Sequence, residues 1–276
     1  MSDKVETRNV KNNASKKGNK DLLFLKSDGI ATIRLNRPGK KNSFTMDMID
    51  QWVEALEKSR KDADVKVIVV TGTGDSFCSG ADLAGLRDAE NCAIDHKNML
   101  WEQIHRVALI MEDIDKPIIA AVNGIAVGAG MDMALMCDLR FVADTARFSE
   151  GYIRIGVVPG DGGCYFLPRL VGVAKALELF WTGDFIDARE ALRIGMVNRV
   201  YPADKLMEET YDFARKIADS PELAIRTTKR ATYQSSRVEL RTALDLISSH
   251  VGVIRTLKDH HEAVNKMGYL QNEVGK

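Results

Sequence analysis

The chain has 276 residues, 45% of them hydrophobic, so it can bury a large core, and its length suits one domain with an appended helical piece. Its 39 basic residues balance 39 acidic ones, which removes the electrostatic case for a nucleic-acid binder and for a peripheral membrane protein that relies on basic charge. We therefore expect a small-molecule partner. The four cysteines lack metal-ligand spacing, so we expect reduced thiols in a cytoplasmic compartment, with neither disulfide nor zinc.

A polar tail precedes the first predicted element. Residues 1–20 are rich in Lys, Asn and Ser and nearly devoid of apolar side chains, so they are expected to be disordered, and they resemble neither a secretory signal nor a transit peptide. No later segment is apolar for long enough to span a membrane. Residues 21–27 and 30–35 then alternate around Asp28-Gly29, which predicts a β-hairpin with a two-residue turn.

A basic loop follows the hairpin. Residues 37–42 include Lys40 and Lys41, which are suited to holding phosphates, although lysines in such loops are more often simply solvated. Thr45 is placed to cap an amphipathic helix over residues 46–60.

The next strand ends in a loop without periodicity. Residues 65–71 predict a buried strand, and residues 72–83 contain three glycines at the strand end where α/β proteins place their sites. A helix is predicted over residues 94–112. It carries His96 and His105, for which a solvated or core-edge position is favoured over metal ligation.

The stretch from Lys116 to Asp138 changes its hydrophobic period halfway. Residues 117–122 are continuously apolar, as in a strand buried on both faces, whereas residues 131–135 are apolar at helical spacing. The glycines between them bring the backbone close to another group, and the amides that open the helix have no partner within it, which predicts an anion site. The alternative is a tight strand-to-helix turn. The spacing G-x3-G-x-G is neither a dinucleotide fingerprint nor a Walker loop.

A third polar segment follows. If its first part is extended, Glu150, Tyr152 and Arg154 share one face beside a glycine-rich turn. Asp161 stands where it would cap a helix over residues 164–170, and capping alone would explain this aspartate.

The rest of the chain is predominantly helical. Strands are predicted only at residues 139–143 and 197–200, and helices at 174–181, 188–194, 205–218, 221–233 and from 238 to the C-terminus. We therefore divide the chain into a tail (1–20), a core (21–200) and a C-terminal helical region (201–276). His260 and His261 are neighbours on a predicted helix and do not share a face, which argues against a chelating pair.

Four stretches carry a resemblance to a known family: Arg37-Pro-x3-Asn42, Ser79-Gly-Ala-Asp-Leu83, Lys116-Pro to Asp138, and Val158-Pro-Gly-Asp-Gly-Gly163. Together they resemble the crotonase family of enoyl-CoA hydratases and isomerases, over about residues 21–270. The resemblance implies an α/β fold, a spiral of repeated ββα units whose C-terminal helical region makes trimer contacts, in a homotrimer or a dimer of trimers. It also implies an acyl-CoA substrate, as in fatty acid metabolism, and no cofactor beyond the coenzyme A of that substrate.

The resemblance further implies an enolate formed from a thioester, with its oxygen held by two backbone N–H groups. By motif position these donors are Ala81 and Ala129. The residues agree, because Ala129 lies where a helix begins and the helix dipole favours negative charge there. Coenzyme A is assigned by position to the following residues: Lys40, Lys41, Ser79, Gly80, Ala81, Asp82, Leu83 and Gly128.

The chain departs from the family at both acids. Hydratases of the family carry two glutamates, one activating water and one protonating the α-carbon, and here Asp132 and Tyr152 stand in their places. Asp132 is either the principal acid or a charge that complements the helix dipole. Tyr152, with a reference pKa of about 10, is either a weak proton donor or pocket wall, and Glu150 and Asp161 are alternatives for the second acid. Because most of the overall resemblance is to hydratase-like members, and Glu150 and Asp161 are candidates for the second acid, an enoyl-CoA hydratase is expected first. An enoyl-CoA isomerase is expected second, and a non-catalytic acyl-CoA-binding homologue third.

Overall fold

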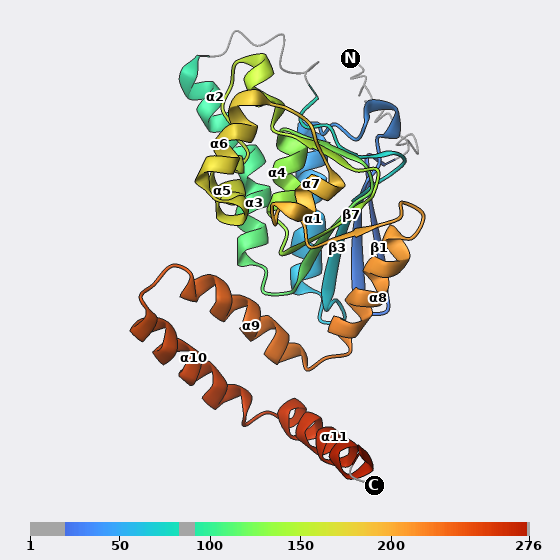
Figure 1. Cartoon of the computed structure of the whole chain (residues 1–276), viewed down its shortest axis with the longest axis vertical. Coiled ribbons are helices and arrows are strands. Elements are labelled where there is room, and N and C mark those ends of the chain that lie inside the picture. The colour runs from blue at the N-terminus through green and yellow to red at the C-terminus, as the bar shows by residue number, and fades with distance from the viewer. Residues whose placement is uncertain (1–19, 83–91, 275–276) are drawn as a thin grey trace, which may run out of the picture.

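The computed structural model describes residues 20–82 and 92–274. Leu83 lies outside the described residues, and so does the expected N-terminal tail, except for Lys20. Within them the strands form two sheets, one of six strands in the order β1-β2-β3-β5-β7-β10 and one of four in the order β4-β6-β8-β9 (Figure 1). The larger sheet consists of β1 (Leu22–Ser27), β2 (Ile30–Leu35), β3 (Val67–Gly72), β5 (Ile118–Val122), β7 (Leu139–Ala143) and β10 (Arg199–Tyr201). The smaller consists of β4 (Ser76–Cys78), β6 (Ile125–Val127), β8 (Arg147–Ser149) and β9 (Ile186–Asp187).

The predicted hairpin opens the larger sheet. β1 and β2 pair antiparallel with Ser27 opposite Ile30, and both turn residues have positive φ, 51° at Asp28 and 74° at Gly29. This is the backbone that a two-residue hairpin turn requires, so the prediction is confirmed. The other pairings of the larger sheet are parallel.

Successive strands alternate between the two sheets. In the pairs β3–β4, β5–β6 and β7–β8, the first strand joins the larger sheet and the second joins the smaller one, and a helical segment follows each pair. These segments are α2 (Ala93–Met99), a π-helical turn η3 (Leu100–Ile104) and α3 (His105–Asp113); then α4 (Ala129–Leu135); then η4 (Gly151–Ile155), α5 (Gly163–Val171) and α6 (Val173–Thr182). The three pairs are thus three ββα units wound in sequence.

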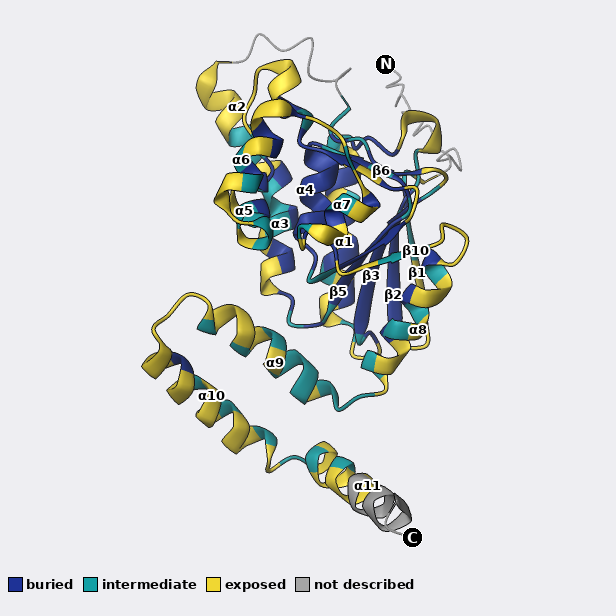
Figure 2. Ribbon diagram, in the orientation of Figure 1, coloured by how far each residue is buried: buried dark blue, intermediate teal, exposed yellow. Residues whose placement is uncertain are grey.

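The core lies between the larger sheet and the helices. Every residue of β3 and β5 is buried, as their continuous apolar runs predict, and Figure 2 shows these strands in dark blue. α1 (Met46–Lys61) packs against α3, and Thr45 accepts a hydrogen bond from the Met48 amide as its N-cap. α8 (Leu206–Ala218) packs on β2, β3, β5 and β7. The remaining short helices are η1 (Pro38–Lys40) and α7 (Ala188–Arg193).

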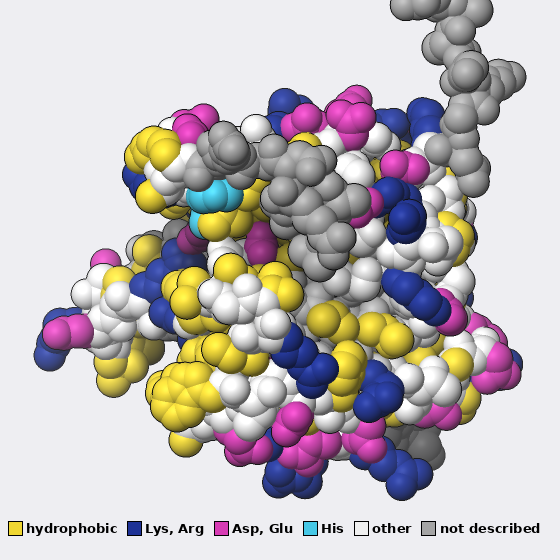
Figure 3. All heavy atoms as spheres, turned by 90° about the horizontal axis from the view of Figure 1, so that it is seen from above, with side chains coloured by type: hydrophobic (Ala, Val, Ile, Leu, Met, Phe, Trp, Pro, Cys, Tyr) yellow, Lys and Arg dark blue, Asp and Glu magenta, His cyan; other side chains and the backbone are white. Residues whose placement is uncertain are grey.

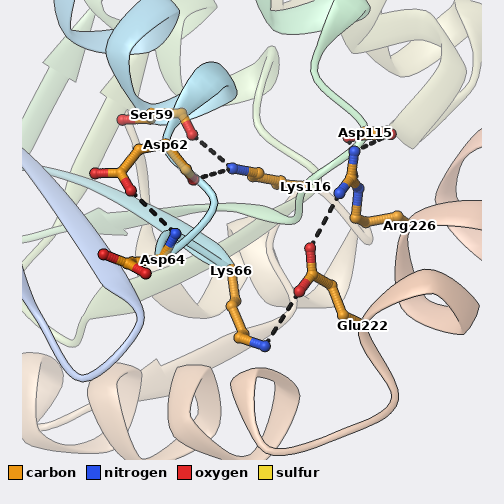
Figure 4. Close-up of polar contacts among 8 residues, drawn as sticks. All are labelled: Ser59, Asp62, Asp64, Lys66, Asp115, Lys116, Glu222 and Arg226. Carbon is orange, nitrogen blue, oxygen red and sulfur yellow. Dashed lines mark hydrogen bonds and ion pairs between the residues drawn. The ribbon is translucent and has the colours of Figure 1, made fainter. Parts of the chain in front are cut away.

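The last three helices, α9 (Glu222–Ser235), α10 (Leu240–Ile254) and α11 (Lys258–Val274), extend away from the two sheets (Figure 1). Ion pairs join α9 to the body: Arg226 contacts both carboxylate oxygens of Asp115 at 2.9 and 3.0 Å, and Glu222 contacts Lys66 at 3.1 Å (Figure 4). α10 carries large apolar side chains that are exposed in this single chain: Leu240, Leu244, Ile247, Val251 and Val253.

Lys116 is buried beside the contact between α9 and the body of the protein. Its Nζ donates hydrogen bonds to the carbonyl oxygens of Ser59, at 2.8 Å, and Asp62, at 2.7 Å, which close the end of α1 (Figure 4). Lys116→Met is expected to lower the free energy of unfolding by about 3 kcal/mol, because one buried and one partly buried carbonyl lose a charged donor. Urea denaturation measures this change. Lys258→Met is the control, since that side chain is 87% exposed, and equal stabilities of the two variants would contradict the role given to Lys116.

Candidate active site

The glycine-rich stretch of residues 123–130, here called the glycine corner, contacts the loop after β4, which is distant in sequence. Gly128 precedes α4 with φ 51° and ψ −124°, and its amide donates to the Ser149 carbonyl at 2.8 Å. Gly80 has φ 95°, and a β-carbon there would lie 3.1 Å from the Val127 carbonyl oxygen and 3.7 Å from the Ala129 nitrogen. The loop after β4 therefore packs directly on the start of α4, and both glycines have backbone conformations that other residues rarely adopt.

Two backbone N–H groups, those of Ala81 and Ala129, belong to the two segments that pack together at this corner. Phe44 pairs with the loop on either side of Ala81, since its amide donates to the Gly80 carbonyl and its carbonyl accepts from the Asp82 amide, both at 2.9 Å. Because successive amides of an extended chain point to opposite sides, the Ala81 N–H points away from Phe44. The Ala129 N–H is the first of α4 and has no acceptor within that helix.

A cluster of acidic groups lies one helical turn beyond Ala129. The Tyr152 hydroxyl, in η4, is 2.7 Å from Asp132 Oδ2, in the first turn of α4, and 2.8 Å from Asp161 Oδ2, just before α5. All three side chains are buried. The structure therefore brings together three of the predicted site residues.

Asp161 does not cap α5, so that interpretation is wrong. The N-cap of α5 is Gly162, with φ 122°, and the helix begins at Gly163. The Asp161 carboxylate faces the Tyr152 hydroxyl instead of the helix amides.

The expectation that Glu150, Tyr152 and Arg154 share the face of an extended segment is also wrong. This segment is the 3-10 helix η4, and Arg154 lies outside the cluster, donating to the Gly183 carbonyl at 2.8 Å. Glu150 still joins Asp132, because a β-carbon on Gly163 would lie 3.2 Å from Glu150 Oε1 and 2.6 Å from Asp132 Oδ1. Glu150 is 1% exposed, and neither of its carboxylate oxygens has a hydrogen-bond partner within the described residues.

Burial shifts every acid of the cluster toward its neutral form. It raises the pKa of Asp132 to about 7, an effect that the Tyr152 hydroxyl opposes and the charge of Asp161 reinforces. It raises the pKa of Glu150 to about 10, with the negative charge of Asp132 adding to the rise. The pKa values of Asp161 and Tyr152 are raised by burial as well. The site therefore holds carboxylic acids near neutral pH, where they can both give and take protons.

His105 approaches the cluster from α3. Its Nε2 lies 2.8 Å from the Gly160 carbonyl oxygen, and Trp101 packs edge-on against its ring. The predicted core-edge position is thus correct, but the helix predicted over residues 94–112 is interrupted by the π-helical turn η3. Sequence reasoning missed the proximity of His105 to Asp161, because no periodic signal links α3 to the loop before α5.

Among the described residues predicted to bind coenzyme A, Ser79 to Asp82 form the loop after β4, and Lys40 and Lys41 lie beside that loop. The amide of Ser79 donates to the Lys41 carbonyl at 3.0 Å, so the loop lies against η1. Lys40 and Lys41 are exposed, and Lys41 pairs with Asp75 at 2.7 Å. Asp82 contacts Arg37 at 2.9 Å. Figure 3, which views the molecule from above, shows Lys and Arg side chains among Asp and Glu, so the face seen there is of mixed charge.

Other sequence expectations concern cysteines, metals and membranes. Cys78 and Cys137 are buried free thiols, and Cys92 and Cys164 are exposed free thiols. Within residues 20–82 and 92–274, no three His, Cys, Asp or Glu side chains are arranged to hold a metal ion. None of the helices described there has the length and apolar character that a membrane crossing requires.

Glu150→Gln is expected to flatten the dependence of stability on pH. Since the folded protein raises the Glu150 pKa from 4.5 to about 10, its protonation stabilises the fold fully below pH 4.5, and this contribution is lost as pH rises toward about 10. The melting temperature of the wild type should therefore fall relative to Glu150→Gln across this range.

Glu57 provides the opposite case. Hydrogen bonds from Lys61 and Arg60 lower the pKa of Glu57, so the stability that ionised Glu57 contributes is lost as the pH falls. Glu57→Gln should therefore change the melting temperature only at acidic pH. Parallel melting curves of the wild type and Glu150→Gln over the whole range would contradict the assignment of Glu150 as a neutral acid.

Comparison with known proteins identifies this arrangement. The sequence profile of the family described as "Enoyl-CoA hydratase/isomerase" matches residues 26–266. The chain belongs to the enoyl-CoA hydratase/isomerase family. Both the crotonase resemblance and the expected fold class are thereby confirmed.

Individual members of the enoyl-CoA hydratase/isomerase family are similar over most of their length. The chain is 32% identical to a crotonyl-CoA hydratase of Syntrophomonas wolfei, covering 88% of this chain and 93% of the relative. It is also 32% identical to a 2,3-dehydroadipyl-CoA hydratase of Escherichia coli, over 89% and 94%. Among solved structures, an enoyl-CoA hydratase of Mycobacterium smegmatis superposes with a TM-score of 0.86 at 29% identity, over 92% of this chain and 97% of that one.

Proposed function

We propose that this protein is an enoyl-CoA hydratase that adds water to the double bond of a 2-enoyl-CoA thioester. The observation that carries the proposal is the packing of the loop after β4 on the start of α4, beside a buried cluster of acids. These two segments carry the proposed donors, the N–H groups of Ala81 and Ala129. In this proposal the two N–H groups hold the thioester oxygen as it becomes an enolate. Removing one such donor typically costs about 3–4 kcal/mol of barrier, so this pair would dominate the rate.

The acids divide the proton transfers between them. Asp132 lies one helical turn beyond Ala129, which suits it to take a proton from water as the water oxygen bonds to the β-carbon. Tyr152, at the second acid position of the family, has its hydroxyl 2.7 Å from Asp132 Oδ2. Hydration needs both a base at the β-carbon and a proton at the α-carbon, and this cluster contains groups for both.

Coenzyme A is proposed to lie over the loop after β4. Lys40 and Lys41 would approach its phosphates, and Ser79, Gly80, Asp82 and Gly128 would line its path to the glycine corner. Because the contact with phosphates is electrostatic, binding of acetyl-CoA in calorimetry should weaken as salt increases.

We further propose that the exposed apolar face of α10 is covered by other copies of the chain, in a homotrimer or a dimer of trimers. A cytoplasmic location is proposed from the four free thiols. No cofactor besides the coenzyme A of the substrate enters this proposal.

Double-bond isomerisation is the second candidate, favoured by the presence of a carboxylate at only one of the two acid positions of the family. One base is enough to shuttle a proton between the two ends of a migrating double bond. The experiment offers a 2-enoyl-CoA and a 3-enoyl-CoA in parallel and follows the absorbance of the conjugated thioester. Loss of the 2-enoyl signal with formation of a 3-hydroxyacyl product supports hydration. Appearance of that signal from the 3-enoyl substrate alone supports isomerisation, and binding without turnover of either supports a non-catalytic homologue.

A further inference from the structure

The contacts of Tyr152 define where protons lie in the cluster. A phenol has one hydroxyl proton, yet the Tyr152 oxygen is 2.7 Å from one aspartate oxygen and 2.8 Å from another. Both contacts can be full hydrogen bonds only if the Tyr152 hydroxyl donates one of them and accepts the other. Only a protonated carboxyl can donate the second bond, so Asp132 and Asp161 together hold one extra proton.

We propose that Tyr152 relays this proton between the two aspartates, so that Asp161 serves as the proton reserve for the α-carbon. The inference rests on the proposed hydratase function. Asp161 acts through Tyr152 and touches no substrate. The relay explains why a tyrosine, a poor acid on its own, can occupy the second acid position.

The relay can be written with every proton accounted for. In the resting enzyme Asp132 is ionised, Tyr152 donates to Asp132 Oδ2, and the protonated Asp161 donates to the Tyr152 oxygen. As the water oxygen bonds to the β-carbon, its proton moves to Asp132 Oδ1, which has no partner among the described residues. The neutral Asp132 no longer holds the Tyr152 proton strongly, so that proton passes to the α-carbon while Asp161 reprotonates Tyr152.

The cycle closes through the same three residues. After hydration Asp132 is neutral and Asp161 is ionised, with Tyr152 neutral before and after. Rotation of the neutral Asp132 carboxyl brings its proton beside the Tyr152 oxygen, and transfer from Asp132 to Tyr152, and from Tyr152 to Asp161, then restores the resting state. The raised pKa of Tyr152 is consistent with a phenol that never remains as a phenolate.

The surroundings act on both aspartates. The helix amides at the first turn of α4 stabilise a carboxylate at Asp132, whereas burial raises the pKa of Asp161 and His105 lowers it. These opposing effects let the shared proton lie on either aspartate, as the relay requires. Tyr152 also flanks the donor corner, because a β-carbon on Gly128 would lie 3.7 Å from its ring. The other titratable groups that face the unit come from four different elements: Cys78 on β4, His105 on α3, Glu150 before η4 and Cys164 on α5.

The first test is kinetic and uses a double-mutant cycle on the full-length protein. Asp161→Asn and Tyr152→Phe should each lower kcat for 2-enoyl-CoA hydration by about 10²–10⁴-fold with little change in KM. The double variant should be no slower than the slower single variant, because the two residues act as one unit. Asp161→Glu should restore part of the rate, since it returns a transferable proton. Wild-type kcat in Asp161→Asn, or multiplicative losses in the double variant, would overturn the relay.

The second test is infrared spectroscopy, which does not depend on turnover or on a variant that folds. Protein labelled with carbon-13 in aspartate should show, at neutral pH, a label-shifted C=O band of a protonated carboxyl. A protonated band that responds only to labelled glutamate would belong to Glu150 and overturn the proposal. A wild type that hydrates no 2-enoyl-CoA but shows the aspartate band would refute the hydratase assignment and leave the shared proton established.

Discussion

Asp132→Asn is expected to lower kcat for hydration by about 10²–10⁴-fold while the KM for a 2-enoyl-CoA changes little. The carboxamide keeps the shape of the side chain and its position against Tyr152, but it cannot take a proton from water. Steady-state kinetics with the conjugated thioester measure both constants. The loss should appear in kcat, because the proton transfer stabilises the transition state and not the bound substrate.

Asp47→Asn is the matched control, because Asp47 also lies in the first turn of a helix, α1, but is exposed and far along the chain from the cluster. It removes the same kind of charge from a helix start without touching the acids, so kcat should stay at the wild-type value. If Asp132→Asn also keeps wild-type turnover, Asp132 is not a catalytic acid, and its charge only complements the dipole of α4.

Gly130→Ala should damage both stability and turnover. Its β-carbon would lie 2.1 Å from the Cys78 carbonyl oxygen, so α4 and the end of β4 must move apart. Overpacking of this kind costs about 1–3 kcal/mol. The same movement separates Ala129 from Ala81, and a misplacement of about 1 Å at a reacting centre can cost 10²-fold in rate. Urea unfolding and kcat together test the prediction.

Gly252→Ala is the control for Gly130→Ala. Gly252 lies in α10, and no atom of its own chain lies within 4 Å of an added β-carbon, so alanine should stabilise that helix by up to about 1 kcal/mol and leave kcat unchanged. If Gly130→Ala matched this behaviour, the close approach of β4 and α4 would not be needed for the donor pair.

The parts of the fold with local signals could be predicted from the sequence. Asp28-Gly29 indicated the hairpin, Thr45 indicated the start of α1, and the change of period across residues 116–138 indicated the strand, corner and helix that carry Ala129 and Asp132. In each case the physical cause lies within a few neighbouring residues.

The acid cluster could be predicted only as a set of candidates. Whether residues 151–155 are extended or a 3-10 helix is decided by their packing, and this decides that Arg154 points away from the cluster while Tyr152 points into it. The contact of Asp161 with Tyr152 depends in turn on where α5 begins. An aspartate can serve either as a helix N-cap or as a partner in a buried hydrogen bond. Its presence before a helix therefore does not show which of the two roles it has.

The smaller sheet also has a consequence for how the protein folds. Its strands contain only two or three residues each and come from four separate stretches between Ser76 and Asp187, so none of them is stable before the segments around it have docked. Contacts so distant in sequence form slowly, because long loops must close before the pairing stabilises them. The position of the glycine corner depends on this sheet, because β4, β6 and β8 hold the segments around it. During refolding, helix content and the β1–β2 hairpin should therefore return first, and enzymatic activity last.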